Sequence, residues 1–204
     1  MMKEIEWGTN IKDLPDMVFM KVIEHGKKVY TREGEKMKIG DADTARVAYG
    51  FHHDRLYEVQ IHFRSFFNFL KLKEKLFKLY GPGRQPSGFL ETYHWNGKET
   101  SVFLTYDENS GKGAIGYTFL PIYKERQEDR KLEEVSSWLA SLTDMERRVI
   151  TLRFGFNGED PLTLESIGER LGLVPEKIHQ IGAEAIEKLR RISKKEEIDS
   201  GDVL

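Results

Sequence analysis

The sequence "LTLESIGERLGLVPEKIHQIGAEAIEKLRRI", residues 162–192, has the spacing of two helices joined by a tight turn. In its first half, apolar residues recur every three or four positions, as on the buried face of a helix: Leu164, Ile167 and Leu171. Thr163 is a favourable N-cap for this helix, and Gly172 is favourable at its end. A second helix is predicted from Pro175, because the first helical position does not need the N–H that proline lacks.

The second helix has a buried stripe of its own, again with apolar residues three or four positions apart: Ile178, Ile181, Ala185 and Leu189. Two helices joined by a turn of three or four residues that contains glycine follow the helix-turn-helix plan. Helices that cross closely need short side chains, so we expect Gly168 and Ala183 at the crossing. A further helix is predicted over 142–155, where Thr143 and Glu146 have capping-box spacing.

Residues 142–192 resemble region 4 of the sigma-70 family of bacterial RNA polymerase initiation factors. The family pattern LT-x-x-E-R-x-V-x-x-L-R-F-G is matched by Leu142, Thr143, Glu146, Arg147, Val149, Leu152, Arg153, Phe154 and Gly155. The pattern of the next helix is matched by Thr163, Leu164, Glu165, Ile167, Gly168 and Gly172. The pattern of the last helix is matched by Glu176, Ile178, Gln180, Ile181, Ala185, Lys188, Leu189 and Arg190.

In that family, region 4 docks on the flap of the polymerase β subunit and reads the −35 promoter element in the major groove. The resemblance therefore implies promoter DNA and the RNA polymerase core as partners. It implies that the residues facing the bases and nearby phosphates are Glu176, Lys177, His179 and Gln180. Candidates for contacts with the phosphate backbone are Arg147, Arg153, Arg170, Arg190, Arg191 and Lys194. The last three residues have an alternative role as a solvated helix end that complements the helix dipole.

The outer face of the last helix departs from the family pattern at positions where the family usually carries cations: Pro175, His179, Glu184 and Glu187. Arginine is the usual reader of guanine, and a histidine is mostly neutral near pH 7. Glu176 and Gln180 keep the capacity to pair with cytosine and adenine. Residues 163–195 carry seven cationic and five acidic side chains. We therefore expect weakened or altered specificity, and an affinity that depends on a partner.

The first part of the chain has a different sequence pattern, in which short apolar runs alternate with turn residues. Strands are predicted over 17–23, 27–31, 45–51, 55–63, 89–95, 100–107 and 113–122, and one helix over 65–81. The predicted fold class is α+β, with an N-terminal antiparallel sheet and one packed helix, followed by an all-α helix-turn-helix domain. The predicted domains are 1–122, a charged helical connector over 123–137, the helix-turn-helix domain over 138–195, and a polar tail over 196–204.

Several classes of site and location are disfavoured by the composition. The chain has no cysteine, which excludes disulfides and zinc sites with cysteine ligands. Acidic residues stand where a signal peptide needs an apolar core, and the apolar runs are too short to span a membrane, so we expect a soluble, cytoplasmic protein. Four histidines lack the i, i+4 spacing of metal ligands, so we expect no metal and a structural or exposed role: His52, His53, His62 and His94. No cofactor motif and no nucleophile–base pair is recognisable, so we expect no enzyme activity.

These observations favour a transcription regulator that contacts promoter DNA and RNA polymerase. Residues 1–122 do not resemble the promoter-melting region of the family, so we expect the chain not to open promoters alone. The alternative is a protein-binding module that imitates region 4, on the β flap or an anti-sigma partner, with little DNA affinity. A third hypothesis makes the N-terminal sheet a small-molecule sensor. In each case residues 1–122 are expected to bind a ligand, to dimerise or to bind a protein partner.

Overall fold

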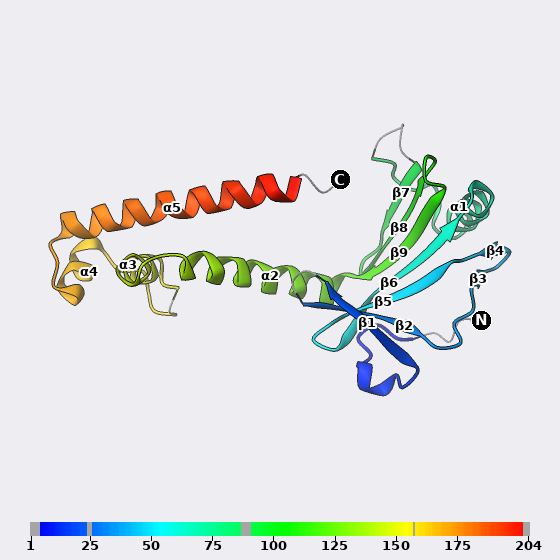
Figure 1. The fold of residues 1–204 in the computed structure, drawn as a ribbon, viewed down its shortest axis with the longest axis horizontal. Coiled ribbons are helices and arrows are strands. Elements are labelled where there is room, and N and C mark those ends of the chain that lie inside the picture. The colour runs from blue at the N-terminus through cyan, green and yellow to red at the C-terminus, as the bar shows by residue number, and fades with distance from the viewer. Residues whose placement is uncertain (1–4, 24–25, 87–90, 157, 202–204) are drawn as a thin grey trace. The chain divides into compact units, whose positions relative to one another are not determined.

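The computed structural model describes residues 5–23, 26–86, 91–156 and 158–201, with side chains as far as Lys194 (Figure 1). The chain divides into two compact units, Met1–Glu128 and Asp129–Leu204. None of the helices in this described part of the chain is both long and apolar enough to cross a membrane.

The first unit is built on a seven-stranded antiparallel sheet (Figure 1). In spatial order its strands are β1 (Met17–Ile23), β2 (Lys27–Arg32), β5 (Arg46–His52), β6 (Arg55–Arg64), β9 (Lys112–Phe119), β8 (Thr100–Asp107) and β7 (Glu91–Asn96). A 3₁₀ turn, η1 (Ile11–Asp13), precedes the sheet. The α+β class predicted from the sequence is confirmed.

Helix α1 (Phe66–Tyr80) packs on this sheet through Phe69, Leu72 and Leu76, which are at most 3% exposed. Burying each of these side chains contributes about 1.5–3 kcal/mol. The helix starts at Ser65, whose hydroxyl accepts a hydrogen bond from the Asn68 N–H, and it ends at Gly81 with φ 78°. Because this glycine has no Cβ, it adopts the positive φ without steric cost.

The structure differs from the predicted elements of this unit at two places. The strand predicted over 113–122 ends at Phe119, and Leu120 begins helix α2 (Leu120–Ala140). A short apolar run such as "FLPI" has no period that separates strand from helix, which explains the error. The small hairpin of β3 (Lys38–Ile39) and β4 (Ala42–Asp43) was not predicted, because two-residue strands are too short to alternate visibly.

The second unit contains the end of α2 followed by three helices: α3 (Asp144–Phe154), α4 (Leu164–Leu171) and α5 (Pro175–Gly201). Helix α5 continues to Gly201, into the segment predicted as a polar tail over 196–204. Its residues 196–200, "EEIDS", include neither glycine nor proline, so they do not interrupt a helix. Residues 24–25, 89–90, 157 and 202–204, which belong to predicted turns, a strand, a loop and the tail, lie outside the described residues.

Candidate nucleic-acid interface

The start of α3 is held by the capping box that the sequence predicts. The Thr143 hydroxyl accepts from the Glu146 N–H at 3.4 Å, and the Glu146 carboxylate accepts from the Thr143 N–H at 2.9 Å. The buried Glu146 also accepts from Lys188 Nζ of α5 at 2.6 Å. This hydrogen bond lowers the pKa of Glu146, and it links α3 to α5.

The turn between α4 and α5 depends on two glycines. Gly172 ends α4 with φ 69°, in the left-handed region, and the Leu173 N–H donates to the Gly168 carbonyl at 2.9 Å. A Cβ on Gly168 would lie 2.5 Å from the carbonyl oxygen of Leu173, closer than real Cβ contacts. Gly168 is therefore required by the turn itself, and not by a crossing of two helices as we expected.

The inner face of α5 carries the predicted apolar stripe. Ile178 is fully buried and Ile181 is 9% exposed in one apolar cluster, whereas Ala185 is fully buried in a second cluster, against which Leu189 packs. Ala183 was expected at the crossing but is exposed, and the buried small residue is Ala185, which packs with Leu142 and Ile150. The stripe thus fixes which face of α5 is turned to solvent.

The residues predicted to face DNA bases lie on the exposed side of the first turns of α5: Glu176, Lys177, His179 and Gln180. Lys177 Nζ donates to the Gln180 side-chain oxygen at 3.1 Å, and the Gln180 amide nitrogen donates to Glu184 at 2.9 Å. Glu184, which departs from the family pattern, therefore orients the Gln180 amide. Base contacts by these residues stay a prediction.

The arginines predicted to contact phosphates separate into two groups. Arg147 and Arg170 line one hollow of about 540 Å³ together with Arg148, which the sequence analysis missed. Arg147 pairs with Asp144, and Arg170 pairs with Glu159 at 2.8 Å. Arg153 is held apart from this hollow, because its guanidinium donates to the Leu162 carbonyl at 2.8 Å and so links α3 to the start of α4.

Two of the later cations of α5 belong to a different surface. Arg190 and Lys194 border an apolar groove of about 580 Å³. The groove is otherwise lined by Val135, Trp138, Leu139, Ile150, Phe154, Phe156, Ile186, Leu189 and Ser193. Arg191 pairs with Glu187 at 3.3 Å, one turn earlier on the same helix. The alternative role of these cations as a helix end that complements the dipole is wrong, because α5 continues to Gly201 and its last turn carries no basic residue. With a rise of about 1.5 Å per residue, Arg190 lies about 15 Å along the helix from Gln180.

A capped helix, a glycine-dependent turn and a second helix with an exposed outer face place this unit in the class of helix-turn-helix DNA-binding modules. Residues 138–191 match the family model "Sigma-70, region 4". The resemblance found in the sequence is confirmed: this segment is similar to region 4 of the sigma-70 family.

Three curated relatives match the same part of the chain. They are the RNA polymerase sigma factor SigA4 of Synechococcus elongatus, RpoS of Coxiella burnetii and the chloroplastic sigD of Arabidopsis thaliana. Their identities are 46%, 35% and 46%, over 30%, 35% and 29% of this chain. The aligned part covers 20%, 20% and 14% of the relatives, so the chain spans a fifth or less of their length.

One solved structure, a DUF4309 family protein from Bacillus subtilis, matches 42% of this chain and 70% of its own. Its sequence identity is 18% and its TM-score is 0.25, so nothing about function follows from this likeness.

Proposed function

We propose that this protein regulates transcription by placing its region 4 on a −35-type promoter element while the same unit contacts RNA polymerase. The observation that carries the proposal is the region 4 match over 138–191, combined with an exposed outer face on the first turns of α5. DNA melting would come from another component, because the described residues of the first unit form an antiparallel sheet around α1.

In the proposed complex the N-terminal turns of α5 enter the major groove. Glu176 would accept from the amino group of a cytosine, and Gln180 would exchange its partners Lys177 and Glu184 for an adenine. The hollow lined by Arg147, Arg148 and Arg170 would receive a backbone phosphate. Because exposed ion pairs are worth about 1 kcal/mol or less, Asp144 and Glu159 would not prevent the exchange.

The apolar groove between the end of α2, α3 and α5 is the proposed docking surface for the β flap. Phe154 and Phe156 are about half exposed, and their rings stack at 5.9 Å between centroids. Aromatic side chains that remain exposed beside a groove are typical of protein-binding surfaces. Binding at this groove would raise the local concentration of α5 at the promoter, which offsets the few cations on its outer face.

The proposal is tested by measuring binding of the full chain to a −35-type duplex across a salt series, with and without the β flap. We expect an affinity that falls with salt. Gln180→Ala should reduce the preference for the specific base pair while it leaves non-specific affinity almost unchanged. A Gln180→Ala protein with unaltered base preference would refute the assignment of Gln180.

The alternative is a module that imitates region 4 without reading DNA. It is favoured by the acidic residues Glu184 and Glu187 on the outer face, together with the apolar groove. The same titration separates the two proposals, because this alternative predicts flap binding with no DNA affinity and no salt dependence.

The first unit also contains a hollow of about 620 Å³, which supports the hypothesis of a small-molecule sensor. Four aromatic residues contribute to its lining: Trp7, Tyr80, Trp95 and Tyr117. Lys98 and Glu99 add charges of both signs, so a ligand here would be an aromatic molecule with polar groups. Since Trp7 and Trp95 both line the hollow, occupancy would be followed by tryptophan fluorescence.

A further inference from the structure

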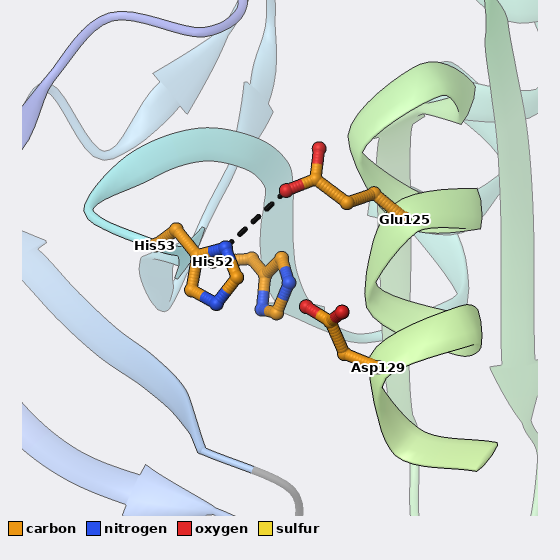
Figure 2. Close-up of side chains that lie close together, drawn as sticks. All are labelled: His52, His53, Glu125 and Asp129. Atoms are coloured by element: carbon orange, nitrogen blue, oxygen red, sulfur yellow. Dashed lines mark hydrogen bonds and ion pairs between the residues drawn. The ribbon is translucent and has the colours of Figure 1, made fainter. Parts of the chain in front are cut away.

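Two histidines and a glutamate meet beside α2 in the first unit (Figure 2). His52 is the last residue of β5, His53 follows it in the turn to β6, and Glu125 lies on α2. The potential ligand atoms of these three residues all lie within 4.8 Å of one another.

The turn explains why adjacent histidines face the same way. Neighbouring side chains in a strand point to opposite faces. His53 and Asp54 have φ of 46° and 60°, and His52 pairs with Arg55, so these residues form a two-residue hairpin turn with positive φ at both central positions. The His52 and His53 rings consequently stack, with centroids 4.1 Å apart and planes at 26°.

The spacing of the ligand atoms suits a small divalent ion. In a tetrahedral zinc site with bonds of about 2.0 Å, ligand atoms lie about 3.3 Å apart. His53 Nδ1 and Glu125 Oε1 are already 3.2 Å apart. His52 is 6% exposed, whereas the His53 side chain is 63% exposed, so one ligand is fixed in the core and the other faces solvent.

We propose that His52, His53 and Glu125 bind a divalent transition-metal ion, for which zinc is the probe. Imidazole nitrogen and carboxylate oxygen are ligands that zinc, nickel and copper ions accept. Water would fill the remaining position. The ion would join the β5–β6 turn to α2, and it gives the first unit a ligand that is independent of the DNA-binding proposal.

Arg55 competes with the ion for the same carboxylate. Its guanidinium donates to Glu125 Oε1, the oxygen that also faces His53. Metal binding must displace this contact, and it places the metal ion beside the positively charged guanidinium of Arg55. Removing the arginine charge should therefore strengthen metal binding. A histidine cluster with only a structural role would not show this effect.

The test is isothermal titration of the full chain, without a polyhistidine tag and stripped with a chelator, with zinc chloride. We expect one-to-one binding. His53→Asn keeps a residue that tolerates positive φ, and Glu125→Gln keeps the side-chain shape, yet each should weaken binding by about tenfold or more. Arg55→Gln should tighten it, and His94→Gln, on β7, should leave it unchanged.

The outcome that overturns the proposal is a wild-type protein without one-to-one zinc binding, or zinc binding that survives both His53→Asn and Glu125→Gln. Thermal unfolding of the metal-free variants identifies any that fail to fold. A variant that keeps the melting temperature of the metal-free wild type is folded, so its zinc affinity tests the proposal. His53 is exposed, so its substitution should disturb folding least.

Discussion

At the scale of single residues, Glu184 has two opposite effects on the outer face of α5. It places a negative charge where DNA phosphates would approach in the proposed complex, and it also accepts the hydrogen bond that orients the Gln180 amide. The charge of Glu184 changes the affinity for all DNA sequences alike, whereas the orientation of the Gln180 amide changes the preference for particular bases. The two effects can therefore be measured separately.

Glu184→Lys is predicted to strengthen binding to every DNA sequence and to reduce base preference. Each additional phosphate contact should steepen the dependence of log K on log salt by about 0.9. Glu74→Lys makes the same change of charge on exposed α1 and is the control. Equal gains from the two substitutions would mean that net charge, and not the face of α5, governs binding.

A second residue-scale prediction concerns Glu146 and pH. The hydrogen bond from Lys188 lowers the pKa of Glu146 below its ordinary value of 4.5. A carboxyl with a lowered pKa stabilises the fold above its unfolded pKa, and this stability is lost as the pH falls through the folded pKa. Wild-type stability should therefore fall below about pH 4.5 more steeply than that of Glu146→Gln.

This prediction is checked by urea unfolding of both proteins at pH 7 and at several acidic pH values. Glu169→Gln, an exposed residue on α4, is the control and should follow the wild type. Parallel pH profiles for wild type and Glu146→Gln would show that the Lys188 contact contributes no net stability.

At the scale of elements, the α4–α5 turn has a strict steric requirement. The backbone of Leu173 approaches Gly168 so closely that no side chain fits, and a carbonyl oxygen cannot rotate away as a flexible side chain can. Gly182 on α5 is a useful contrast, because a Cβ there would meet only Val149, at 3.8 Å.

Gly168→Ala is predicted to lower the free energy of unfolding by about 1–3 kcal/mol, the usual cost of overpacking. Gly182→Ala should instead raise it by about 0.5–1 kcal/mol, because alanine is the better residue inside a helix. Urea unfolding followed by circular dichroism measures both. A Gly168→Ala protein as stable as the wild type would contradict the close approach to Leu173.

At the scale of the whole molecule, DNA reading and polymerase docking are assigned to separate surfaces of the second unit. The bases would meet the first turns of α5, whereas the flap would meet the groove bordered by Phe154, Phe156 and the later turns of α5. A substitution on one of these two surfaces should therefore leave the function of the other surface intact.

Phe156→Ser is predicted to abolish the gain in promoter affinity that the β flap provides, while binding to DNA without the flap stays unchanged. Phe156 is 53% exposed, so the substitution should not unfold the helices. Phe67→Ser on α1, where the residue is 77% exposed, is the control. Loss of DNA binding in the absence of the flap would show that the two surfaces are not independent.

Local signals predicted most of region 4 and much of the sheet. The capping box of Thr143 and Glu146, the glycine end of α4 and the proline start of α5 each act over a few residues, so a sequence displays them directly. The predicted end of the strand was wrong, because the short apolar run that begins at Phe119 fits a strand and a helix equally. The strands β3 and β4 were not predicted, because two residues are too few to show an alternation of apolar and polar side chains.

The sequence by itself determined the α+β class, the region 4 segment and the inner and outer faces of α5, because helix caps and apolar periods are local properties. Only the tertiary structure decided that Arg148 joins Arg170, that Lys188 reaches Glu146, and that His53 lies beside Glu125. The last two pairs are 42 and 72 residues apart in sequence. Such contacts exist only after helices and strands have packed, and a residue-by-residue pattern does not encode which distant side chains packing brings together.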